Sequence, residues 1–143
     1  MSLKFTRDDY KVFYPMQTRW ADNDIYGHVN NVQYYGYFDS AVNRYLIEEG
    51  GLDIHNDGVV GFVVESKCQY FAPIAYPQEL HIGLRVSRLG NSSVTYEIGI
   101  FVAGEPSPSA QGYFVHVFVD KKSNQSTQIP SNILDGLKRI QIK

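Results

Sequence analysis

The sequence has a single cysteine, Cys68, and no long apolar run, and each scarcity excludes a class of protein. One cysteine permits no internal disulfide, which is typical of proteins that fold in a reducing cytoplasm. No stretch approaches the about 18 consecutive apolar residues of a membrane-spanning helix, and the polar residues 1–10 are unlike a secretion signal. We therefore expect a cytoplasmic protein without a membrane segment.

The chain also lacks strong charge and the common cofactor motifs. Its formal net charge of −2 gives no basic surface for nucleic acid or anionic lipid. No H-x-x-x-H or C-x-x-C spacing indicates a metal site, and neither the G-x-S-x-G elbow nor a nucleotide-binding glycine pattern occurs. Aromatic residues are abundant instead, with 11 Tyr and 8 Phe among 143 residues. This length predicts one domain, residues 1–143, with a sizeable core.

The hydrophobic pattern predicts an α+β fold. Apolar residues alternate with polar ones over 11–20, 80–87 and 94–102, whereas 59–71 and 113–119 carry apolar residues on both faces, and together these patterns predict five strands. Pro15 favours an edge strand or a bulge, and the face of 80–87 that carries Arg85 reads as polar. Apolar residues three and four apart predict a helix over 31–49 with the buried face Val32, Tyr35, Phe38, Val42, Tyr45 and Leu46. A short helix follows Pro130.

This order of elements predicts one antiparallel sheet that curls around the long helix. Such a sheet leaves an edge strand and one face uncovered, so we expect partner subunits.

Residues 20–35 carry the chemistry of interest. Asn30 reads as the helix N-cap, with Gln33 completing a capping box. Because a helix start presents unpaired N–H groups, a carboxylate just before it, Asp24, suits acyl transfer to or from a bound carbonyl. The alternative is that Asp22, Asn23 and Asp24 are turn formers that bond their own backbone.

The segment from Asp24 through Tyr26-Gly27-His28-Val29-Asn30-Asn31 resembles the 4-hydroxybenzoyl-CoA thioesterase-like branch of the hotdog-fold thioesterases. It is most similar to bacterial acyl-CoA thioesterases with a D-x-x-G-H-V-N-N segment, and the element order matches over nearly the whole chain. The resemblance implies a hotdog fold: a five-stranded antiparallel sheet around one central helix. It also implies a homodimer or a dimer-of-dimers tetramer, with the active site shared across the subunit interface.

The same resemblance implies hydrolysis of an acyl-CoA to free acid and CoA. Asp24 is the expected nucleophile or general base, with Asp22 orienting or packing, and the backbone N–H of Asn31 the oxyanion donor. Gly27 would allow a conformation that a Cβ forbids. His28 either acts as a general base or shapes the turn.

For substrate binding, we expect an acyl pocket lined by Tyr34, Tyr35, Phe62 and Val64, although a core role explains most of them equally well. The phosphates of CoA would be held near Arg88, Ser92 and Ser93, unless these form an ordinary charged surface. No cofactor or metal is expected, because CoA is part of the substrate. Two alternatives remain: an acyl-ACP thioesterase, and a non-catalytic hotdog protein that binds an acyl ligand.

Overall fold

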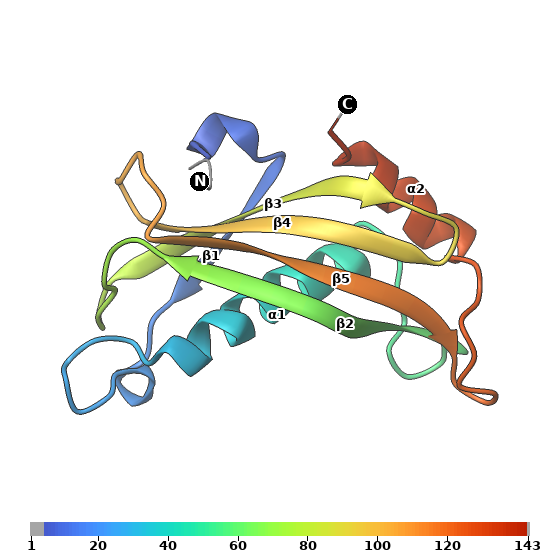
Figure 1. The fold of residues 1–143 in the computed structure, drawn as a ribbon, viewed down its shortest axis with the longest axis horizontal. Helices are drawn as coiled ribbons and strands as arrows, with labels where there is room; N and C mark the ends of the chain where they lie inside the picture. Colours follow the sequence, from blue (N-terminus) through green and yellow to red (C-terminus); the bar gives the residue numbers. More distant parts are fainter. Residues whose placement is uncertain (1–4, 143) are drawn as a thin grey trace.

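The computed structural model describes residues 5–142. One antiparallel sheet has the strand order β1-β3-β4-β5-β2, and helix α1 crosses one of its faces (Figure 1). The strands are β1 (Val12–Gln17), β2 (Val59–Tyr70), β3 (Glu79–Leu89), β4 (Ser93–Val102) and β5 (Ala110–Asp120). The helices are α1 (Asn31–Glu48) and α2 (Ser131–Arg139), with short 3₁₀ turns η1 (Arg7–Asp9) and η2 (Trp20–Asp22). The predicted sheet, long helix and short C-terminal helix are all confirmed.

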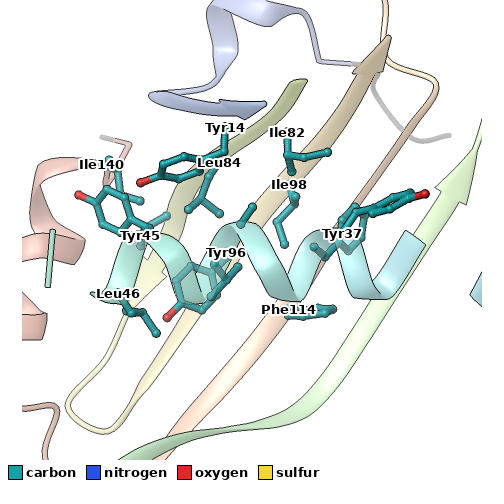
Figure 2. Close-up of a cluster of buried hydrophobic side chains, with 14 of the residues drawn as sticks. Tyr14, Tyr37, Tyr45, Leu46, Ile82, Leu84, Tyr96, Ile98, Phe114 and Ile140 are labelled. Carbon is teal, nitrogen blue, oxygen red and sulfur yellow. The ribbon is translucent and has the colours of Figure 1, made fainter. Parts of the chain in front are cut away.

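The core lies between α1 and the sheet. Phe38, Val42 and Leu46 of α1 are almost fully buried. They share one cluster with branched residues of the central strands, among them Ile82, Leu84 and Ile98 (Figure 2). Because each such side chain contributes about 2 kcal/mol when it leaves water, this interface is the main source of stability.

The buried face of α1 differs from the prediction at its first turns. Val32 is 67% exposed, whereas Tyr34 and Tyr37 are buried. The Tyr34 ring packs edge-on against Tyr70 of β2, with 4.9 Å between centroids. The beginning of the helix therefore turns its tyrosines, rather than Val32, toward the rest of the molecule.

The second face of β3 is buried, not polar as predicted. Gly83 and Gly99 pair across β3 and β4, and the Tyr10 ring lies directly over both. Arg85 on the same face is only 8% exposed and donates to Glu97 at 2.7 Å. The N-terminal segment thus covers a surface that alternation alone assigns to solvent.

The two edges of the sheet differ in character. Pro15 lies in the edge strand β1, as predicted. This strand ends at Gln17, earlier than the predicted residue 20, because Trp20 begins η2 and is 76% exposed. The other edge strand, β2, pairs with β5 alone among the described strands and has a bulge between Val63 and Glu65. Three consecutive apolar residues of β2 are exposed: Phe62, Val63 and Val64.

Candidate functional site

A tight hairpin, residues 23–29, presents Asp24. Asn23 and Val29 form an antiparallel bridge, and the Asp24 N–H donates to the His28 carbonyl at 2.9 Å. The Gly27 N–H donates to the Asp24 carbonyl at 3.1 Å. Gly27 itself has a φ of 85°, the left-handed conformation that three-residue hairpin loops commonly require.

The Asp24 carboxylate is half-buried and partly engaged by its own loop. Its Oδ1 accepts a hydrogen bond from the Tyr26 N–H at 2.9 Å. This oxygen therefore stabilises the turn, as the interpretation of Asp24 as a turn former expects. Its Oδ2 has no hydrogen-bond partner within residues 5–142. The side chain borders a hollow of about 730 Å³ together with Trp20, Asn23, Ile25 and Gly27.

The start of α1 pairs two of its first N–H groups with its own N-cap residue. Asn30 caps the helix, since its side chain accepts from the Val32 N–H at 3.1 Å and its carbonyl accepts from the Gln33 N–H. The predicted capping box does not form, because the Asn30 N–H donates to the Asp22 carbonyl at 2.9 Å instead of the Gln33 side chain. In the described part of the chain, the Asn31 N–H has no acceptor. It is therefore an open donor at this helix start.

A second hollow, of about 310 Å³, lies beside that donor. Its lining includes His28, Asn31, Tyr34, Tyr70 and Phe71. The structure thus brings three of the predicted residues, His28, Asn31 and Tyr34, to one aromatic pocket. Asp24 and Gly27 border the other hollow, so a single chain does not place the carboxylate and the open N–H in one pocket.

Asp22 is the most heavily bonded residue of this region. Its side chain is 1% exposed and accepts hydrogen bonds from the Tyr37 hydroxyl, the Arg19 N–H and the Arg19 guanidinium. Burial raises the pKa of Asp22, but the hydrogen bonds from Tyr37 and Arg19 outweigh it and leave the pKa below its ordinary value. The sequence analysis missed Tyr37, because nothing in the local pattern links it to a residue fifteen positions earlier.

The remaining predicted residues are spread over the molecule. Tyr35 is half-buried and stacks on Phe114, with 6.2 Å between ring centroids. Phe62 and Val64 lie on the open edge of β2. The predicted phosphate ligands, Arg88, Ser92 and Ser93, lie at the β3–β4 hairpin, at the opposite end of the sheet from the Asp24 loop (Figure 1).

Residues 5–142 contain no group of three or more His, Cys, Asp or Glu side chains arranged to hold a metal ion. Over the same range, neither helix has the length and apolar character needed to span a bilayer.

Comparison with known proteins decides the family. The family model described as the thioesterase-like superfamily matches residues 18–137. The chain belongs to this superfamily. The match includes the Asp24 loop, α1, the strands β2 to β5 and most of α2, and the architecture is the hotdog fold of these proteins.

Three relatives illustrate the range of similarity. The crystal structure of the PA5185 protein from Pseudomonas aeruginosa strain PAO1 has 55% identity and a TM-score of 0.95, with 97% of each chain covered. The YsmA protein of Bacillus subtilis (strain 168) is 27% identical over 121 residues, which are 84% of this chain and 80% of YsmA. Slr0204, a 1,4-dihydroxy-2-naphthoyl-CoA thioesterase from Synechocystis, shares the fold with 18% identity and a TM-score of 0.81, covering 88% of this chain and 94% of its own.

Proposed function

We propose that this superfamily member is an acyl-CoA thioesterase in which Asp24 and the Asn31 N–H act on the thioester. The observation that carries the proposal is the open Asn31 donor at the start of α1, beside an aromatic pocket. Membership in the thioesterase-like superfamily supports the reaction class. The thioesterase activity of Slr0204 is consistent with a CoA thioester as substrate.

The chemistry requires a group that attacks and a group that stabilises negative charge. The Asn31 N–H, reinforced by the helix dipole, would stabilise charge on the carbonyl oxygen. Such a donor is worth about 3 kcal/mol of barrier. The free Oδ2 of Asp24 attacks the carbonyl carbon directly, or removes a proton from the water that attacks.

Both routes end in the same products. In the first, the C–S bond breaks, CoA leaves as the thiolate, and water cleaves the resulting anhydride. In the second, water adds to the carbonyl directly and CoA leaves from the tetrahedral intermediate. No cofactor is needed, because CoA itself is the leaving group.

A second copy of the chain would complete the site. The open edge of β2 carries the exposed apolar residues Phe62, Val63 and Val64, which is unfavourable in a monomer. If two β2 strands pair antiparallel about a two-fold axis, opposite ends of the two chains become neighbours. The β3–β4 hairpin of one subunit, with Arg88, would then approach the Asp24 loop of the other, as a homodimer or a dimer of dimers.

The test is release of free thiol from a panel of acyl-CoAs, with aromatic and straight-chain acyl groups, and from the matching acyl-ACPs. We expect turnover of at least one acyl-CoA and slower release from its acyl-ACP. Faster thiol release from acyl-ACP would show that the protein is an acyl-ACP thioesterase. Binding of acyl-CoA without thiol release above the protein-free rate would instead indicate a non-catalytic ligand-binding protein.

A further inference from the structure

Tyr37 lines neither of the two hollows of the site. Its hydroxyl nevertheless donates a hydrogen bond to Asp22, the residue that connects the Asp24 loop to the start of α1. We propose that Tyr37 is a positioning residue: through Asp22, it fixes the Asp24 carboxylate relative to the Asn31 N–H. The inference rests on the proposed function for its catalytic readout, but its structural basis is independent of the substrate.

The contact between Tyr37 and Asp22 is buried and short. The Tyr37 hydroxyl donates to Asp22 Oδ2 at 2.7 Å, and the two residues are 6% and 1% exposed. The same oxygen accepts the Arg19 N–H at 2.9 Å, while Oδ1 accepts from the Arg19 guanidinium at 2.8 and 3.0 Å. Since the Arg19 side chain is 69% exposed, Tyr37 is the buried side-chain donor to this carboxylate.

Asp22 also holds the helix start through its backbone. Its carbonyl accepts the Asn30 N–H at 2.9 Å. Arg19, Asp22, Asn30 and Tyr37 thus form one unit, the Asp22 anchor, which joins η2, the N-cap and the second turn of α1.

Each of the two proposed catalytic groups closely follows a residue of this anchor in the chain. Asp24 follows Asp22 by two residues, and Asn31 follows Asn30 directly. A rotation of Asp22 therefore shifts the Asp24 carboxylate against the open N–H. Because a displacement of about 1 Å between reacting groups is able to lower a rate about 100-fold, the Tyr37 hydroxyl controls turnover without touching substrate.

The chain offers a matched control on the same helix. The Tyr45 hydroxyl donates to the Gly136 carbonyl at 2.6 Å, and Tyr45 is 3% exposed. Tyr37 and Tyr45 lie toward opposite ends of α1 and direct their hydroxyls away from each other (Figure 2). Tyr45→Phe removes a buried hydroxyl hydrogen bond as Tyr37→Phe does, but far from the Asp22 anchor.

The first measurement is kcat and KM for thiol release by Tyr37→Phe and Tyr45→Phe, each alone and combined with Asp24→Asn. We expect Tyr37→Phe to lower kcat about 10- to 100-fold with KM nearly unchanged, and Tyr45→Phe to leave kcat within about twofold. In the Asp24→Asn background, Tyr37→Phe should have no further effect, because the group it positions is gone. Equal kcat values for the two Phe variants, or an undiminished effect of Tyr37→Phe without Asp24, would overturn the inference.

The second measurement needs no turnover. Amide hydrogen exchange of peptides spanning residues 23–31 should accelerate in Tyr37→Phe and not in Tyr45→Phe, because the Asn30 N–H loses a fixed acceptor. Unchanged exchange there overturns the inference even if the protein hydrolyses no thioester. The opposite combination separates the two proposals. If exchange accelerates in Tyr37→Phe but Asp24→Asn is as active as the wild type, the Asp22 anchor is supported and the proposed function is refuted.

Discussion

The Asp24 carboxylate accepts the Tyr26 N–H through Oδ1 at 2.9 Å, which leaves Oδ2 without a partner in the described chain. One oxygen holds the loop and the other remains for chemistry. The structural and catalytic contributions of Asp24 are therefore separable by substitution.

The loop contribution is tested by comparing Asp24→Asn with Asp24→Ala. Asparagine keeps an oxygen that accepts the Tyr26 N–H, so its free energy of unfolding should stay within about 0.5 kcal/mol of the wild type. Alanine removes the acceptor and should cost about 1 kcal/mol. Urea unfolding measures both, and an equal loss in the two variants would contradict the assigned bond.

Gly27 should be sensitive to a single added methyl group. Its φ of 85° strains any residue with a Cβ, although within residues 5–142 no atom beyond its chain neighbours lies within 4 Å of the added carbon. Gly27→Ala should therefore lower the free energy of unfolding by about 1 kcal/mol through backbone strain alone. The matched control is Gly36→Ala, in the open on α1, which should raise stability by up to about 1 kcal/mol. Changes of the same sign in both variants would refute this explanation.

His116 should make stability fall in mild acid. Burial lowers its pKa to about 4, from an ordinary value of 6.5 that the unfolded chain retains. As the pH falls from 6.5 toward 4, the unfolded state binds a proton that the folded state does not, so stability is lost across that window. The two pKa values correspond to a loss of about 2 kcal/mol between pH 7 and pH 5.

The check is urea unfolding at pH 7 and pH 5 for His116→Leu, with the exposed His55→Gln as control. The decrease in the free energy of unfolding from pH 7 to pH 5 should be about 2 kcal/mol smaller in His116→Leu than in the wild type. In His55→Gln the full decrease should persist. The Asp22 carboxyl, with its lowered pKa, loses its contribution only at lower pH and equally in all three proteins. An unaltered pH dependence in His116→Leu would show that another group is responsible.

The open edge of β2 should govern both assembly and activity. Val64→Glu places a charge among the exposed apolar residues of that edge and should convert a dimer into a monomer in light scattering. Thiol release should fall with it, because the proposed site needs both subunits. Ile54→Glu, an equally exposed position in the loop before β2, should change neither. A fully active Val64→Glu monomer would show that one chain suffices.

The sequence predicted the elements well because each of them has a local cause. Asn30 caps α1 through its own side chain, and Pro15 marks an edge strand since it lacks an N–H. Where contacts come from distant residues, the prediction was wrong. Arg85 is buried because Tyr10 and its neighbours cover β3, and Val32 is exposed while Tyr37 reaches Asp22. The same limit applies to the site. The pattern predicts a site at the Asp24 loop and the helix start, but the Tyr37–Asp22 bond depends on how helix and loop meet.

The most direct test of the central claim is the kcat of Asp24→Asn with the acyl-CoA that the wild type hydrolyses fastest. Because asparagine retains the loop bond but has neither a nucleophilic nor a basic oxygen, we predict a loss of at least about 100-fold in thiol release, with an unchanged circular dichroism spectrum. A folded Asp24→Asn protein that still turns over within a few-fold of the wild type would contradict the account.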